Sequence, residues 1–416
     1  MITVERLDLR GEGVAGDTVI ARTLPGEVVE GDAQGGRIGQ PRIVRPSPRR
    51  VAAPCPHYRS CGGCALQHAD DLFVADWKQG VLRRALSGQR LEAPFRPAHC
   101  SPPGARRRAT LAGRRLKSGA LVGFHGRASV MVASVPGCLL LAPALMAAIP
   151  ALEALVALGG TRKGTMALAV TALEGGVDVA ARGGKALDAG LRRDLPRIAA
   201  AHGLARLSWD SELLYQPAPP LLKLGKAQVP LPPGAFLQAT AEGEAALLAA
   251  VCAALGEGGA LRGPVADLFA GCGTFALPLA EAAEVHAVES DAAALGALDA
   301  GWRGAAGLKR ITCERRDLFH RPLLPEELAR FGALVIDPPR AGASAQMAEI
   351  ARAAGQGRAP KVIAMVSCNP VTFARDARVL VGAGYRLDWV QMVDQFRWSA
   401  HVELAARLSR GHIARN

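Results

Sequence analysis

From about residue 231 onward, short apolar runs alternate with segments of helical pattern, and this alternation restricts the possible folds more than any other feature of the chain. The run at 265–269 leads into a glycine-containing loop and a predicted helix at 275–283. The run at 285–289 leads into a predicted helix at 291–304. Further apolar runs follow at 333–337, 361–366 and 386–392. Strands that alternate with helices predict an α/β fold with a doubly wound, Rossmann-like parallel sheet.

Three of these runs end in motifs that carry chemistry. The motifs are Asp267-Leu-Phe-Ala-Gly-Cys-Gly-Thr274, Asp337-Pro-Pro-Arg340 and Ser367-Cys-Asn-Pro370. The carboxyl ends of parallel strands meet at the edge of the sheet where ligands bind. A free cysteine is most often a small buried residue. Because Cys368 stands at this edge together with the other two motifs, we interpret it as a nucleophile.

The glycine loop and two acids indicate an adenosyl ligand. Gly271 and Gly273 let the backbone approach a ligand in front of a helix N-terminus, although a lone Gly-x-Gly is weak support. Glu289 ends the next strand, where it can accept hydrogen bonds from both ribose hydroxyls, and Asp317 follows a predicted strand at 311–314 and can approach adenine. The loop lacks the third glycine of the dinucleotide fingerprint. S-adenosylmethionine therefore fits better than NAD.

A second cluster of cysteines lies near the N-terminus. Cys55, Cys61 and Cys64 fall within ten residues, and two glycines allow the last pair to face one centre. A [4Fe–4S] cluster needs four thiolates. Cys138, in a Val-Pro-Gly-Cys turn, is the fourth candidate, and Cys100 is its rival.

Zinc is the competing metal for this motif. Four cysteines also form a closed structural zinc site, in which His57 or His68 could replace a thiol. The spacing differs from that of radical S-adenosylmethionine enzymes, so we expect a structural or RNA-facing role.

The charge balance suits a polyanionic partner. The chain has 50 Lys and Arg against 37 Asp and Glu, a net charge of +13, and phosphate contacts gain affinity through counterion release. Frequent use of arginine in an ordinary soluble protein is the alternative. We find no signal peptide and no run of about 18 uncharged apolar residues. The nine cysteines are odd in number and indicate a cytoplasmic protein with free, metal-bound or catalytic thiols.

The chain is too long for one hydrophobic core and divides into three predicted domains. Residues 1–46 are expected to form a β module that is too short for a full barrel, with strands at 18–21 and 27–29. Residues 47–230 are expected to form a mixed α/β central domain, and residues 231–416 the doubly wound domain. Within the central domain we expect helices at 71–92 and 143–158 and strands at 120–124, 130–133, 166–170 and 177–180.

These motifs together resemble the bacterial RNA (uracil-5-)-methyltransferase family. Within it, the chain is similar to the 23S rRNA branch, which carries an N-terminal TRAM domain, here truncated, and a [4Fe–4S] cluster. The matching residues span most of the chain: Pro25-Gly-Glu27, Cys55, Cys61-Gly-Gly-Cys64, Gln67-His68, Cys138, Phe236-Leu-Gln238, Asp267 to Thr274, Glu289, Asp337-Pro-Pro-Arg340, Ser367-Cys-Asn-Pro370 and His401-Val-Glu403. The Ser-Cys-Asn-Pro and Asp-Pro-Pro-Arg pair is specific, whereas many methyltransferases share the glycine loop.

The resemblance implies the formation of 5-methyluridine in RNA, with S-adenosylmethionine as methyl donor. Carbon 5 of uracil becomes nucleophilic once a thiolate adds to carbon 6, and a base must later remove the carbon-5 proton. The resemblance makes Cys368 the nucleophile and Glu403 the base. It makes Cys55, Cys61, Cys64 and Cys138 the ligands of the cluster. It places these residues around the donor: Gln238, Phe269, Thr274, Glu289, Asp317 and Asp337.

Two departures from the family pattern bear on the RNA target. Ala105-Arg-Arg-Arg108 stands where the family has a tyrosine-containing stretch, and Phe396-Arg-Trp-Ser399 stands where it has Phe-Pro-His-Thr. We expect 23S rRNA as the substrate and a monomeric enzyme. The alternatives are the same reaction on tRNA, an amino-methyltransferase that uses Asp-Pro-Pro, and a catalytically silent RNA-binding protein. The presence of both Cys368 and Glu403 argues against the last.

Overall fold

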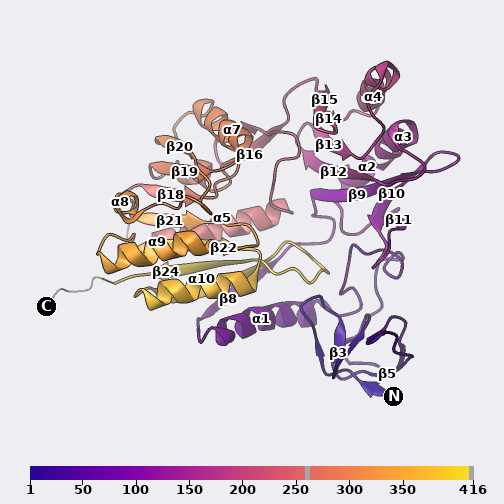
Figure 1. The fold of residues 1–416 in the computed structure, drawn as a ribbon, viewed down its shortest axis with the longest axis horizontal. Helices are drawn as coiled ribbons and strands as arrows, with labels where there is room; N and C mark the ends of the chain where they lie inside the picture. Colours follow the sequence, from indigo (N-terminus) through magenta and orange to yellow (C-terminus); the bar gives the residue numbers. More distant parts are fainter. Residues whose placement is uncertain (258–262, 412–416) are drawn as a thin grey trace.

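The computed structural model describes residues 1–257 and 263–411 and is built around an eight-stranded sheet (Figure 1). The last residues of the predicted C-terminal domain, 412–416, lie outside the described residues. The strand order is β20 (Ile311–Arg315), β19 (Val285–Glu289), β18 (Val265–Leu268), β21 (Ala333–Ile336), β22 (Val362–Ser367), β24 (Leu404–Ser409), β23 (Arg386–Asp394) and β8 (Phe95–Cys100). β8 comes from the segment that the sequence assigns to the central domain.

The prediction of a purely parallel sheet is wrong at one strand. Pairing is parallel from β20 through β22, but β24 runs antiparallel to both β22 and β23. The connection between β23 and β24, residues 395–403, is too short for the crossover that parallel neighbours need. β24 therefore returns beside β22 in the opposite direction.

Helices cover both faces of this sheet, and the central strands β18 and β21 are therefore buried on both sides. One face packs against α1 (Asp71–Gly88), α9 (Ser344–Gly355) and α10 (Pro370–Gly382). The other packs against α5 (Ala241–Gly256), α6 (Ala276–Leu279) and α7 (Ala292–Arg303). Figure 1 shows α9 and α10 in front of the sheet and α5 behind it. The helix predicted at 275–283 is thus shorter than expected, as is the one predicted at 71–92. A short helix, α8 (Pro325–Leu328), precedes β21.

The central region is a seven-stranded sheet with its own core. Its order is β11 (Val132–Ser134), β10 (Ala120–His125), β9 (Arg108–Arg115), β12 (Met166–Leu173), β13 (Gly176–Arg182), β14 (Arg206–Trp209) and β15 (Glu212–Tyr215). The single helix predicted at 143–158 is two helices, α2 (Pro143–Ala147) and α3 (Ile149–Gly159). Pro150 lacks the N–H that would continue the first helix, so a new one begins there. The helix α4 (Ala189–Ala201) completes the region. The hairpin of β16 (Leu221–Leu224) and β17 (Ala227–Pro230) follows it in sequence but packs against α7 in the core of the eight-stranded sheet.

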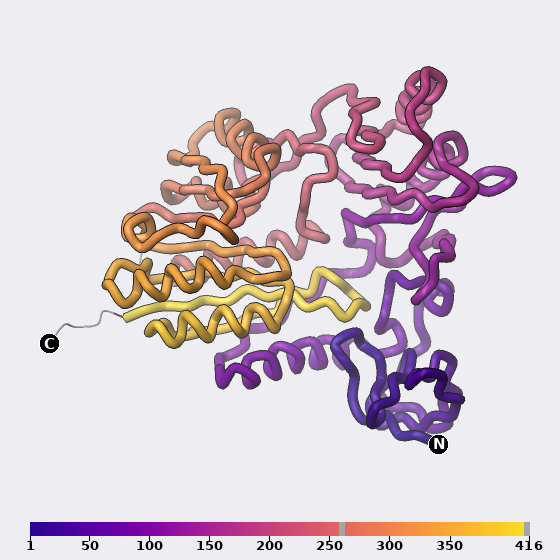
Figure 2. The backbone as a smooth tube through the Cα atoms, in the orientation of Figure 1, coloured from indigo at the N-terminus to yellow at the C-terminus, as the bar shows by residue number. Residues whose placement is uncertain are grey.

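The N-terminal module has more strands than its sequence pattern predicts. One sheet joins β1 (Ile2–Thr3), β5 (Val28–Glu30) and β7 (Arg42–Arg45), and another joins β2 (Arg6–Leu7), β3 (Gly13–Ala15), β4 (Thr18–Ile20) and β6 (Arg37–Ile38). Val4, Ile20, Val29 and Ile38 form its core. Figure 2 shows this indigo module next to the start of α1. Among the described residues, no helix has the length and apolar character needed to span a membrane.

Candidate active site

The register of the sheet brings the three strand-end motifs to one edge. Leu268 pairs with Ile336, which pairs with Met365. Phe269 and Asp337 therefore leave the sheet at the same level, and β22 continues two residues further before Cys368 leaves the same edge.

Glu403 reaches the same edge through the antiparallel strand. Ser367 pairs with Leu404, so Cys368 and Glu403 flank one cross-strand pair although 35 positions separate them in the sequence. Cys368 is half-buried. Burial and then the carboxylates of Glu403 and Asp337 raise the pKa of its thiol, and Arg340 acts in the opposite direction. The reactive thiol of the sequence prediction thus lies among ionisable groups.

The Glu403 side chain is enclosed, and its residue is 4% exposed. Burial, followed by the charge of Asp337, raises the pKa of the Glu403 carboxyl to about 8. One of its oxygens accepts a hydrogen bond from Gln395 Nε2. A carboxyl with a pKa near neutrality is suited to proton transfer.

A line of buried side chains connects Glu403 with Asp337. Gln395 Nε2 donates to Gln238 Oε1 at 2.8 Å, and Gln238 Nε2 lies 3.5 Å from Asp337 Oδ2. Burial raises the pKa of Asp337 to about 7. Gln238 and Asp337, both expected around the donor, thus share one polar network with Glu403.

The glycine loop and Glu289 form a second group at this edge. Phe269 and Gly271 both have a left-handed backbone, with φ of 65° and 54°, and such strain in a non-glycine residue is typical of functional sites. A Cβ at Gly271 would meet no atom within 4 Å, so the space beside the loop is open. Glu289 Oε2 accepts from Gly271 N at 3.0 Å, and Oε1 accepts from Asp291 N at 2.8 Å. The carboxylate is therefore held beside the loop.

Asp267 is the least satisfied acid of the site. The residue is fully buried, and neither carboxyl oxygen has a hydrogen-bond partner among the described residues. Burial, followed by the charges of Asp337 and Glu289, raises its pKa well above the usual range. The Ala276 N–H in the first turn of α6 acts in the opposite direction but does not reach hydrogen-bonding geometry. The sequence analysis used Asp267 only as a motif residue.

Asp317 follows the edge strand β20, and Thr274 ends the glycine loop after β18. Asp317 Oδ1 accepts from Phe319 N at 2.9 Å, and Thr274 is half-buried. The Phe319 ring is 42% exposed and lies 5.7 Å from the Phe269 ring. Sequence reasoning missed Phe319, and an aromatic residue two positions after Asp317 was the available signal.

Three arginines lie near the ionisable groups of the site: Arg108 near Glu403, Arg106 near His401 and Arg340 near Cys368. The Arg108 guanidinium lies 4.5 Å from the centre of the exposed Phe236 ring. The Arg106 guanidinium lies 5.4 Å from the Phe396 ring, and Arg340 Nη2 contacts His401 Nδ1 at 2.8 Å. Arg106 and Phe396 belong to the two segments that depart from the family pattern.

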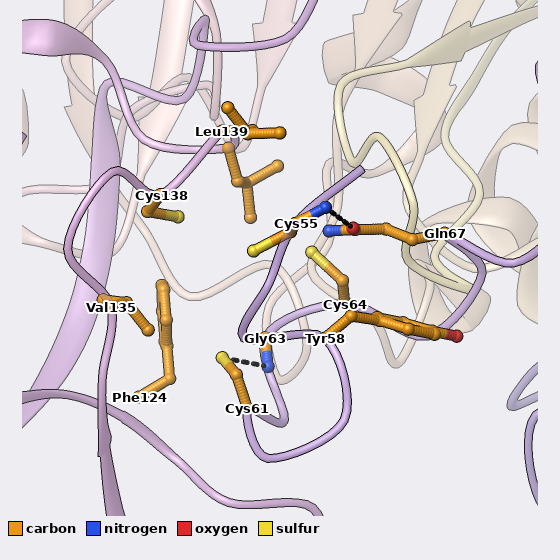
Figure 3. A pocket seen from close by; sticks show the side chains of 11 residues that line it. Cys55, Tyr58, Cys61, Gly63, Cys64, Gln67, Phe124, Val135, Cys138 and Leu139 are labelled. Carbon is orange, nitrogen blue, oxygen red and sulfur yellow. Dashed lines mark hydrogen bonds between the residues drawn. The ribbon is translucent and has the colours of Figure 1, made fainter. Parts of the chain in front are cut away.

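The four cysteines expected to bind a cluster line one enclosed cavity. Figure 3 shows the thiols of Cys55, Cys61, Cys64 and Cys138 directed toward the same space. All four are free thiols. Most of the remaining wall is apolar or aromatic, and it includes Tyr58, Phe124, Val135, Leu139 and Leu140.

The alternative ligands lie elsewhere. Cys100 ends β8 opposite Asp394, and neither His57 nor His68 lines the cavity. His57 Nε2 contacts Pro136 O at 2.9 Å, and His68 Nδ1 contacts the Tyr58 hydroxyl at 2.7 Å. Within residues 1–257 and 263–411, no group of three or more His, Cys, Asp or Glu side chains is close enough to hold a single metal ion.

The loop that carries Cys55, Cys61 and Cys64, called the cysteine loop below, also contacts the 395–403 connection, which contains Glu403. Ala65 N and Leu66 N donate to Trp398 O at 2.7 and 2.9 Å. Trp398 has a φ of 59° and packs in one apolar cluster with Cys55 and Cys64. The N-terminal region therefore holds the 395–403 connection in place.

Comparisons with known proteins identify the family. Residues 230–411 match the family described as tRNA (Uracil-5-)-methyltransferase. A Brucella suis protein named as an uncharacterized RNA methyltransferase is 44% identical over 414 residues, which cover 99% of this chain and 98% of that protein. The 23S rRNA (uracil(1939)-C(5))-methyltransferase RlmD of Burkholderia ambifaria is 33% identical over 461 residues, 99% of this chain and 95% of that protein. This chain belongs to the RNA (uracil-5-)-methyltransferase family.

The assignment that the sequence motifs suggested is therefore confirmed for the family and for the enzyme class. The fold of this methyltransferase is shared with the Pyrococcus abyssi tRNA (uracil-54, C5)-methyltransferase solved in complex with S-adenosyl-L-homocysteine. The TM-score is 0.75 at 23% identity, over 98% of this chain and 99% of that chain. As a member of its family, the chain is an S-adenosylmethionine-dependent methyltransferase. The TRAM-like and iron–sulfur features stay predictions.

Proposed function

We propose that this protein methylates carbon 5 of a uridine in RNA through a covalent bond between Cys368 and carbon 6 of the base. The observation that carries the proposal is the Ser367–Leu404 pair, which places a half-buried thiol and a buried carboxyl at one strand end. A nucleophile beside a base of raised pKa is the arrangement that this chemistry needs.

The residues of the site account for each bond change. The Cys368 thiolate adds to carbon 6, and the electrons of the carbon 5–carbon 6 double bond move toward carbon 5 as an enolate forms. S-adenosylmethionine, when bound, would supply an electrophilic methyl group for carbon 5, and the electron pair of its sulfur–methyl bond would stay with the sulfur of the departing S-adenosylhomocysteine. Glu403 then accepts the carbon-5 proton, and the electrons of that C–H bond restore the double bond. The electron pair of the carbon 6–sulfur bond returns to Cys368 as a thiolate.

We propose that the donor lies against the glycine loop and the Glu289 carboxylate, which are hydrogen-bonded to each other. Gln238, Phe269, Thr274, Glu289, Asp317 and Asp337 would line this place. The open space beside Gly271 and the unpartnered oxygens of Asp267 support the assignment, because buried polar groups normally have partners. Phe269 and the exposed Phe319 offer an apolar surface for the adenine ring.

We also propose that Cys55, Cys61, Cys64 and Cys138 hold a [4Fe–4S] cluster with a structural role. Four converging thiols in an enclosed cavity support it. At a single zinc ion, thiolate sulfurs would lie about 3.8 Å apart. In a cluster each thiolate binds a different iron, so the sulfurs are spaced more widely. The spacing of the four sulfurs in the metal-bound protein would therefore distinguish a cluster from zinc.

For the RNA substrate we propose 23S rRNA. The name of the Burkholderia relative, which aligns with almost the whole chain, supports this choice over tRNA. The Arg108–Phe236 pair near Glu403 and the Arg106–Phe396 pair near His401 suit an unstacked base, because RNA readers stack bases on aromatic and guanidinium planes. A groove between the N-terminal module and the cysteine loop, lined by Arg22, Arg50 and Arg59, suits the phosphate backbone. The three-domain division, the cytoplasmic location and the monomeric state stay predictions from the sequence.

Methyl transfer from labelled S-adenosylmethionine to transcribed 23S rRNA and to transcribed tRNA tests this proposal. We expect 5-methyluridine in the rRNA and little in the tRNA. Labelling of tRNA alone would reverse the choice of substrate. Binding of both RNAs without any methylation would instead favour the catalytically silent alternative.

A further inference from the structure

Gln395 occupies the centre of the polar network and has a partner for both ends of its amide. The residue is 1% exposed. Its Nε2 donates to Glu403 Oε2 and to Gln238 Oε1, and its Oε1 accepts from Thr240 N at 3.3 Å. Because a backbone N–H can only donate, Thr240 fixes which end of the amide faces the acids. The Gln395 nitrogen must therefore face Glu403.

The first turn of α5 is shaped around this side chain. A Cβ at Gly243 would lie 2.1 Å from Gln395 Cγ and 2.5 Å from Cδ. The glycine allows the helix to approach the amide, and Thr240 caps the same turn by accepting from Gly243 N at 3.0 Å. Gln395 thus has little room to move away from Glu403.

We propose that Gln395 is a positioning residue that fixes the Glu403 carboxyl and favours the ionised form that accepts the carbon-5 proton. The proposal rests on the proposed role of Glu403 as the base. Gln395 touches neither reacting atom in this account. It acts through the hydrogen bond to Glu403 Oε2 and takes up no proton itself.

The charges that face Glu403 explain why such a donor is needed. Burial and the carboxylates of Asp337 and Asp394 all raise the pKa of Glu403, and the nearby Cys368 becomes a further negative charge when it ionises. The Gln395 hydrogen bond and the charge of Arg108 act in the opposite direction. A hydrogen bond to the charged form lowers a carboxyl pKa. Loss of the amide should therefore raise the pKa of the base.

The test is the pH dependence of product release from the covalent complex, measured in single turnovers with the better substrate of the two transcribed RNAs. Gln395→Met keeps the length of the side chain and removes its donor. We expect the acid limb of the profile to move up by about one pH unit. Release below that limb would then be about tenfold slower, with recovery at high pH. Gln395→Glu keeps the shape, places an acid against Glu403, and should shift the limb at least as far.

Gln346 offers a matched control. It is fully buried in α9, and its amide pairs with Leu323 N at 2.8 Å and Leu323 O at 3.1 Å. Gln346→Met removes two buried hydrogen bonds, against three in Gln395→Met, but should leave the position of the limb unchanged.

An unshifted limb in both Gln395 variants would overturn the inference, as would an equal slowing at every pH. Glu403→Gln separates this result from the larger proposal. If that variant releases product normally, the assignment of the base fails. If it blocks release while the Gln395 variants keep the original profile, only the role of Gln395 fails.

Discussion

The molecule places cysteines in two contrasting surroundings. Cys368 stands at an open sheet edge among Glu403, Asp337 and Arg340, whose charges act on its thiol. Cys61 and Cys64 are buried in a cavity with mostly apolar walls. Burial raises the pKa of Cys64 to about 12, so that thiol needs a cationic partner before it ionises.

The difference shows what separates a reactive thiol from a structural one. A nucleophile that must leave again needs a base, polar partners and access for the substrate. A metal ligand needs convergent neighbours and protection from solvent. The two regions are joined by Trp398, whose carbonyl accepts from the cysteine loop and whose segment leads to Glu403.

The largest effect that the comparison predicts concerns Cys368. Cys368→Ala should reduce RNA methylation below detection in the labelling assay, because Cys368 is the thiol that lies opposite Glu403 across the β22–β24 pair. Iron content should not change. Cys313→Ala is the control, since Cys313 is also half-buried and lies in the same sheet on β20. Methylation that survives in Cys368→Ala would favour the alternative of an amino-methyltransferase that uses Asp337-Pro-Pro to bind an amine.

Glu403→Gln should slow turnover by about 10²–10⁴-fold, the usual contribution of a general base. The amide keeps the shape of the side chain but cannot accept the carbon-5 proton. The methylated covalent complex should therefore accumulate with ordinary uridine, as a band shift on a denaturing gel. Normal turnover would assign the proton transfer to another group or to water.

Cys138→Ser tests the buried cysteines that we propose as ligands of the cluster. Protein purified without oxygen should contain about four irons per chain, and this variant should lose most of them. Hydrogen exchange should then increase at Leu66 and across residues 395–403, because the cysteine loop donates to Trp398. Cys100→Ser should leave both readouts unchanged. Stoichiometric zinc in place of iron would contradict the assignment of the metal.

The smallest predicted effect is on stability. The folded state raises the pKa of Asp267 above its unfolded value, so this group stabilises the fold fully below the unfolded pKa, and its contribution is lost as pH rises. The loss amounts to at most about 1.4 kcal/mol per pH unit. The unfolding temperature of Asp267→Asn should therefore fall less between pH 5 and pH 8 than that of the parent protein. An identical fall would show that Asp267 is already ionised in the folded protein at pH 5, so that its pKa is not raised into this window.

Much of the C-terminal fold was predictable because long, regular patterns specify it. The strand predicted at 285–289 has those bounds in the structure, and the helix predicted at 291–304 differs by one residue at each end. The N-terminal module was underpredicted because its strands have two to four residues, too few to show a period. The return of β24 and the addition of β8 depend on pairings between distant segments, which no local pattern contains.

The residues of the candidate site also divide into those that a local motif indicated and those that depend on pairings between distant segments. Strand-end motifs indicated Cys368, Asp337 and the glycine loop. Sequence reasoning missed Gln395 because a single glutamine forms no recognisable motif. Its role depends on the position of the end of β23 relative to α5, which no local pattern specifies. The position of Glu403 beside Cys368 came from resemblance alone until the register of β24 placed it there.

The central claim is that Cys368 bonds to carbon 6 of a uridine, and trapping that bond tests it most directly. RNA with 5-fluorouridine at the target position should form a lasting complex, because fluorine cannot leave carbon 5 as a proton does. Digestion and mass spectrometry should then find the methylated fluorouridine on the peptide that contains Cys368. Full methylation of ordinary RNA with no trapped peptide, or a complex that persists in Cys368→Ala, would contradict the account.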